Sequence, residues 1–130
     1  MVRIFEIILG IIFLGAGLNG YIVLFGYEAV LPTSPEAMDF LGTGYLLAIE
    51  KTTEIICGSL LLIRRYVPLS LIVLAGIIVN IFAFHLFVDH ALLPVAILLV
   101  ILECILLWHY RVNFMSLLEK NPIIKKDKSA

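Results

Sequence analysis

Apolar residues occur along this chain in four long runs, separated by short stretches rich in turn-forming residues. The runs cover about residues 4–25, 45–63, 69–88 and 93–110. A helix needs about 20 apolar residues to cross the hydrocarbon core of a bilayer, so the pattern predicts four transmembrane helices. Because the connections are short, we expect antiparallel neighbours in an up-down four-helix bundle of the all-α class.

The start of the second helix has two interpretations. In one, the helix coincides with the apolar run that opens at residue 45. In the other, it begins near Pro35, because Ser34 is a typical N-cap and proline is favoured at the first helical position. Residues 36–44 would then lie at the membrane interface.

Composition points to the bilayer as the solvent. Apolar residues make up 62% of the 130 residues, charged residues only 15%, and the mean hydropathy is +1.12. A soluble domain has about 45–50% apolar and about 25% charged residues. These values exclude a disordered chain and a basic nucleic-acid-binding protein. A chain of this length cannot hide so much apolar surface from water, so the predicted partner is the lipid bilayer and not a nucleic acid.

The distribution of charge predicts the orientation. In a four-pass arrangement, Arg3, the pair Arg64-Arg65 and the tail from Arg111 all fall on one side. The other side carries acidic residues and no lysine or arginine. The positive-inside rule then places both termini in the cytoplasm. The first run is longer than the apolar core of a signal peptide, so we expect it to be retained. The predicted domains are a transmembrane domain at 1–112 and a basic cytoplasmic tail at 113–130.

Polar side chains inside the predicted spans are the candidates for function. An ionisable residue there costs about 2.5–3.5 kcal/mol on insertion scales. Counting about 1.5 Å per residue from the basic anchors puts these side chains in the outer half of the membrane or near its middle. We interpret them as one polar cavity open to the outside. They are Asn19, Glu50, Glu54, Asn80, His85 and Glu103, whereas Lys51 either neutralises a carboxylate on an adjacent helix or extends outward.

Within this set Glu54 is the candidate catalytic residue, as a proton carrier. Glu50 lies one turn away on the same stripe, and two such carboxylates resist ionising together in a low dielectric. Asn19, Glu50, Asn80 and His85 are candidate ligand-binding residues. Asp89 is placed to orient the His85 imidazole. The alternative is a buried hydrogen-bonded network that fixes helix register.

Three further predictions concern packing and chemistry. Glu103 is expected to point inward, toward residues 54–57 of the second helix. Four glycines of the first helix (Gly10, Gly15, Gly17 and Gly20) are interpreted as close-approach positions. Cys57 and Cys104 are expected to act as small hydrophobic residues, and no ligand spacing predicts a metal site.

Several motifs in order along the chain carry a family resemblance. They are Gly17-Leu18-Asn19, Pro35-Glu36-Ala37, the segments 54–62 and 65–69, and Val79-Asn80-Ile81-Phe82-Ala83-Phe84-His85 with the residues up to Asp89. Over about residues 3–118 the chain resembles the DoxX-like family of small bacterial membrane proteins. The resemblance implies a four-helix protein of the bacterial inner (plasma) membrane. Some members are linked to thiosulfate:quinone oxidoreduction and others to membrane-associated redox-stress complexes. By position, Asn19, Glu54, Asn80 and His85 match the polar set of the family.

Three functions are compatible with this sequence. The first is a quinone-interacting or redox-associated membrane subunit whose electrons come from a soluble or membrane redox partner protein. The second is a binder or carrier of a small apolar or lipid-like molecule. The third is a non-catalytic membrane scaffold. Quinone is the cofactor that the first hypothesis requires, and a homo-oligomer is compatible with all three.

Overall fold

The chain is helical throughout the part that the structure describes. The computed structural model describes residues 2–31, 35–42, 44–118 and 120, and these contain helices, turns and loops but no strand. The helices are α1 (Val2–Leu24), α2 (Pro35–Leu41), α3 (Tyr45–Ile63), α4 (Val67–Phe87), α5 (Leu93–His109), α6 (Arg111–Phe114) and the short 3-10 helix η1 (Met115–Leu118). The predicted all-α class is confirmed.

The four long helices lie within about two residues of the predicted runs. The two interpretations of the second helix both describe part of the outcome, because Pro35 starts a helix that does not continue into α3. The backbone takes a positive φ of 70° at Gly42, a conformation that glycine adopts at low cost. As a result α2 ends at Leu41, and α3 begins after Gly44.

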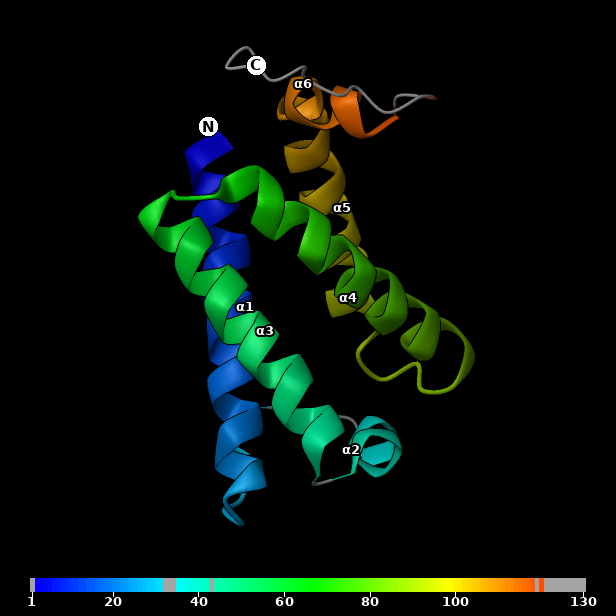
Figure 1. Cartoon of the computed structure of the whole chain (residues 1–130). Helices are drawn as coiled ribbons and strands as arrows, with labels where there is room; N and C mark the ends of the chain where they lie inside the picture. The colour runs from blue at the N-terminus through cyan, green and yellow to red at the C-terminus, as the bar shows by residue number, and fades with distance from the viewer. Residues whose placement is uncertain (1, 32–34, 43, 119, 121–130) are drawn as a thin grey trace, which may run out of the picture.

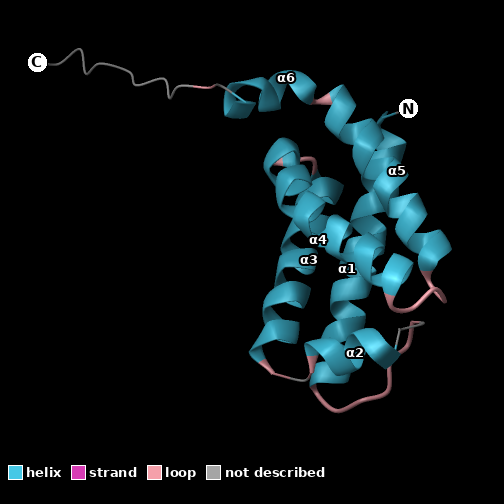
Figure 2. Ribbon diagram, turned by 90° about the vertical axis from the view of Figure 1, so that its right-hand side faces the viewer, coloured by secondary structure: helices cyan, strands magenta, loops and turns pink. Residues whose placement is uncertain are grey.

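The long helices form two antiparallel pairs (Figures 1 and 2). α1 packs along α3, and α4 packs along α5. The pairs are joined by a tight turn in which Arg64 and Tyr66 both adopt left-handed backbone conformations. Arg64 ends α3 by donating its N–H to the last carbonyls, and Pro68 stands in the first turn of α4, where its missing N–H costs no helical bond.

The α1–α3 contact is made by glycines. A Cβ added at Gly58 would lie 2.7 Å from the Leu14 nitrogen, and one at Gly17 would lie 2.9 Å from the Lys51 oxygen. Only residues without a side chain allow two helix backbones to approach so closely. The close-approach prediction is therefore correct for Gly10 and Gly17, whereas Gly20 lies against the Lys51 side chain. At Gly15 an added Cβ would make only ordinary contact, with Leu31 at 3.7 Å.

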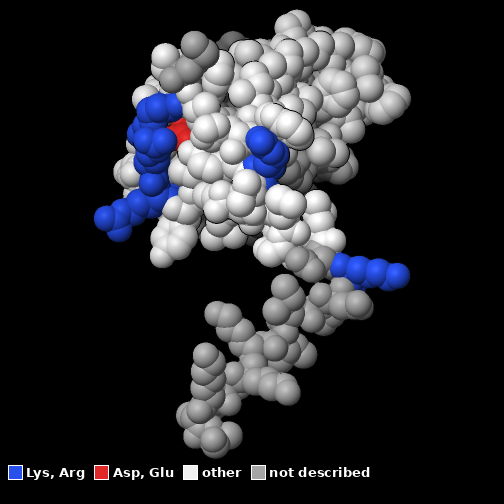
Figure 3. Space-filling view, turned by 90° about the horizontal axis from the view of Figure 1, so that it is seen from above, with Lys and Arg blue, Asp and Glu red and all other residues white. Residues whose placement is uncertain are grey.

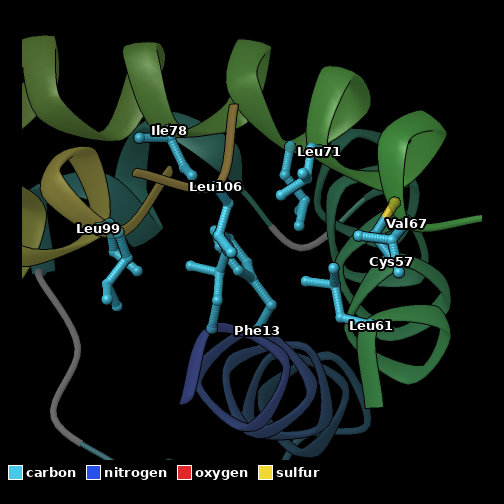
Figure 4. Packing of buried hydrophobic residues seen from close by; sticks show 11 residues of the cluster. Phe13, Cys57, Leu61, Val67, Leu71, Ile78, Leu99 and Leu106 are labelled. Carbon is cyan, nitrogen blue, oxygen red and sulfur yellow. The ribbon is translucent and has the colours of Figure 1, made fainter. Parts of the chain in front are cut away.

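The core is a continuous apolar cluster shared by the two pairs (Figure 4). Leu9 and Phe13 of α1 meet residues of α3, α4 and α5 there, including Leu61, Leu71 and Leu106. All five side chains are almost completely buried.

Two helices of the described part, α1 and α4, are each long and apolar enough to cross a membrane. A third candidate span forms if α5 is counted together with residues 111–118, although the chain bends by 81° between these two parts. α3 is 19 residues long and carries Glu50, Lys51 and Glu54, which lower its hydropathy. These lengths and compositions support the predicted membrane protein.

Candidate functional site

Asn19 is buried near the end of α1 and holds the loop that follows this helix. Its Oδ1 accepts hydrogen bonds from the backbone N–H groups of Val30 (2.8 Å) and Leu31 (3.0 Å). The amide therefore satisfies backbone donors of a loop. In this structure Asn19 therefore has a structural role, because it holds the loop after α1 in place.

The charged residues of α3 pair with one another. Lys51 Nζ lies 3.2 Å from Glu54 Oε2 and 3.5 Å from Glu50 Oε1. The Glu54 side chain is only 1% exposed, so the Lys51 cation is the partner that makes its burial tolerable. The aliphatic stem of Lys51 passes over Gly20 of α1, where an added Cβ would collide with it. A glycine of α1 thus shapes the position of this cation.

His85 and Asn80 lie on different sides of α4. His85 is buried, and its Nδ1 donates to the backbone oxygen of Asp89 at 3.0 Å. Asp89 therefore orients the imidazole through its main chain. Asn80 is exposed and makes no hydrogen bond within the described residues.

The structure therefore does not gather the predicted residues into one hydrogen-bonded cavity. Asn19 binds a loop, Glu50 and Glu54 share Lys51, His85 binds the end of its own helix, and Asn80 faces outward. Asn19, Glu54 and His85 each have a partner nearby in the chain instead of meeting one another.

A different buried group stands out where α3, α4 and α5 meet. Glu103 of α5 is 3% exposed, and neither of its carboxyl oxygens has a hydrogen-bond partner in the described part of the chain. Ser70 of α4 is 1% exposed, and its hydroxyl also has no partner there. Both side chains lie near the buried Cys57 thiol of α3. The inward direction predicted for Glu103 is confirmed.

An unpartnered carboxyl in the core is unusual. Leaving a polar group buried without a hydrogen bond costs several kcal/mol in hydrocarbon, so native proteins nearly always supply a partner. Leu102, which precedes Glu103, and Leu106, about one helical turn further on, are buried in the apolar core and offer none. The cluster of Cys57, Ser70 and Glu103, here called the core polar cluster, is therefore the strongest candidate site in the described residues.

One charged cluster was not predicted from the sequence. Glu6 of α1 is fully buried, and its carboxylate pairs with Arg3 at 3.1 Å and with Arg64 at 3.5 Å. Tyr110, at the end of α5, donates its hydroxyl hydrogen to the same carboxylate. Arg3 also donates to the Leu61 and Leu62 carbonyls at the end of α3. The Arg3–Glu6 spacing of three residues was a visible signal, because such residues are neighbours on a helix.

This Glu6 cluster gathers the start of α1, the α3–α4 turn and the end of α5 at one end of the molecule. Figure 3 looks onto this end and shows lysine and arginine side chains spread over it. Beyond it, Arg111 lies over the Trp108 ring at 4.5 Å, an arrangement typical of an interfacial aromatic residue.

The two cysteines are free, with Cys57 buried and Cys104 exposed. Within the described residues no group of three His, Cys, Asp or Glu side chains is arranged to hold a metal ion. A scan against protein-family models finds no match, and searches of curated proteins and of solved structures also return none.

Proposed function

We propose that the chain is a DoxX-like protein that crosses the bacterial inner membrane four times, as an up-down four-helix bundle with both termini in the cytoplasm. The positive charges of Arg3 and Arg64 meet at the Glu6 cluster, and Glu36 lies on α2 in the connection at the other end of α1 and α3. That asymmetry supports the orientation by the positive-inside rule.

Cysteine labelling tests this topology. In a Cys104→Ser background, Glu36→Cys should react with a membrane-impermeant maleimide in intact spheroplasts. Arg65→Cys should react only after the membrane is permeabilised. Labelling of both positions in intact spheroplasts would contradict the proposed orientation.

Within this topology, the function that the core polar cluster supports best is that of a quinone-interacting, redox-associated membrane subunit. The observation that carries this function is the buried, unpartnered carboxyl of Glu103. A quinone brings carbonyl groups that accept hydrogen bonds, and a quinol brings hydroxyl groups that donate them. A carboxyl group can complement both forms because it can gain or release a proton.

Glu54 keeps a role as proton carrier in this scheme. It lies one helical turn from Cys57 on the buried face of α3, between the core polar cluster and the more exposed Glu50. Reduction of a quinone takes up two electrons and two protons, so a carboxyl group on the way outward can supply a proton. The electrons come from a redox partner protein.

Native mass spectrometry of the full chain, extracted with its own lipids, tests the function. We expect a bound quinone in the wild-type protein and its loss in Glu103→Leu. Glu36→Leu is the matched control, because it removes an exposed carboxyl outside the bundle and should leave the quinone bound. A wild-type protein without quinone, or a Glu103→Leu variant that retains it, would contradict the assignment.

A further inference from the structure

One side of α4 has no partner in the described part of the chain. Leu69 and Phe87 are 57% and 78% exposed, and Gly76 and Asn80 between them are also exposed. A Cβ added at Gly76 would meet nothing within 4 Å. This outward stripe therefore lies largely outside the packing of one molecule.

The residues of this stripe follow a regular spacing. They are separated alternately by four and three residues, which is the repeat by which two helices pack along their whole length in a left-handed pair. The stripe, here called the α4 seam, consists of Leu69, Val73, Gly76, Asn80, Ala83 and Phe87. It runs from the first turn of α4 to its last residue.

The content of the α4 seam is that of a helix-packing surface in a membrane. Gly76 is the only glycine of α4, and small residues let helix backbones approach in lipid. The helix has three strongly polar side chains, Ser70, Asn80 and His85, and of these only Asn80 is exposed. In hydrocarbon an exposed amide lacks the water that would satisfy it, so it favours a polar partner on a neighbouring helix.

We propose that the α4 seam is the interface of a homodimer, in which two copies of α4 pack in parallel and the Asn80 side chains hydrogen-bond to each other. Two copies in one membrane share the same orientation, so a two-fold axis along the membrane normal sets each residue against itself at the same depth. An amide suits that position because it both donates and accepts. A single asparagine in such a seam also specifies the register.

Single-molecule photobleaching of labelled full-length protein in lipid bilayers, over a range of protein-to-lipid ratios, measures this dimer. Asn80→Leu should weaken dimerisation by about three- to thirtyfold, the range given by interhelical hydrogen bonds of about 0.6–2 kcal/mol. The matched control exchanges neighbours, with Val79→Asn and Asn80→Val in one chain. It keeps the composition but moves the amide off the seam by about 100°, and it should weaken the dimer as Asn80→Leu does.

Disulfide trapping gives an independent readout in a Cys104→Ser background. Gly76→Cys and Asn80→Cys should cross-link two copies under oxidation, whereas Val79→Cys should not. A wild-type protein that stays monomeric at high density, equal dimerisation in the exchanged variant, or cross-linking strongest at Val79→Cys would each overturn the homodimer. Recovery of a different membrane protein on the seam in place of a second copy would overturn it as well. None of these readouts involves the quinone, so they stand apart from the test of function.

Discussion

The two helix pairs of this molecule differ in whether their polar side chains have partners. In the α1–α3 pair, each buried polar side chain (Glu6, Asn19 and Glu54) has a partner within the described chain. In the α4–α5 pair only His85 does, whereas Ser70 and Glu103 have none and Asn80 lies exposed. The buried polar side chains of the α1–α3 pair therefore have their partners within the described chain, whereas the α4–α5 pair contains polar side chains that have no hydrogen-bond partner there.

This difference separates structural from functional candidates. A charge that is buried and paired fixes the positions of helices, as Glu6 does for three chain segments. A polar group buried without a partner weakens the fold, and in a membrane protein it is a functional candidate by default. We therefore expect substitutions in the α1–α3 pair to change stability and those at Glu103 to change function.

The largest effect on stability should come from Gly58→Leu. The new side chain would have to occupy space held by the Leu14 and Gly10 backbones, which lie within 2.7–2.9 Å of an added Cβ. Overpacking of this kind costs about 3 kcal/mol. Denaturant unfolding in mild detergent, followed by circular dichroism, measures the change. Gly76→Ala is the control and should be neutral or stabilising by up to about 1 kcal/mol, because its Cβ meets nothing within 4 Å and alanine favours helix. Equal losses of stability in Gly58→Leu and Gly76→Ala would contradict the distinction between the closely packed Gly58 and the open Gly76.

A smaller loss is expected for Glu6→Leu. The substitution removes the acceptor shared by Arg3, Arg64 and Tyr110. Bonds to a charged group contribute about 1.5–3 kcal/mol, and the exposure of Arg64 reduces its share, so we expect a loss of about 2 kcal/mol. The same unfolding measurement, repeated at high salt, checks it. Unchanged stability would show that the Glu6 cluster does not hold the helix ends.

The smallest effect, and the opposite sign, is expected for Glu103→Leu. Replacing an unpartnered buried carboxyl by an apolar side chain of similar size removes a desolvation penalty and fills the site with a core-type residue. In ligand-free protein we expect a gain of up to about 1 kcal/mol. A loss as large as that of Glu6→Leu would indicate that Glu103 has a structural role in the bundle.

The helices were predictable because hydrophobic periodicity and turn residues are local properties. The four apolar runs and the proline at 35 gave the helix positions closely. The break between α2 and α3 could not be predicted from the sequence. It depends on a positive φ at Gly42, and a turn elsewhere in this segment could have ended the helix instead. The close-packed glycines of α1 were found because their role follows from residue type.

The candidate site was predictable only in part, because facing and partner choice are tertiary properties. The inward position of Glu103 followed from the cost of exposing a carboxyl to lipid. The gathering of Asn19, Glu54 and His85 did not occur, since each found a closer partner. The Glu6 cluster was not predicted, because its partners Arg64 and Tyr110 come from distant segments that no local pattern joins to Glu6.

We propose that Glu103 is left without a partner in the chain because a ligand supplies one. The most direct measurement is the unfolding free energy of wild type and Glu103→Leu, each with and without a short-tailed quinone analogue. A ligand that binds only the folded state stabilises it by about 2.7 kcal/mol at a concentration one hundred times its Kd. We predict this concentration-dependent gain for wild type and its absence in Glu103→Leu. Equal stabilisation of the two proteins, or none in either, would contradict the assignment of Glu103 as the ligand-binding carboxyl.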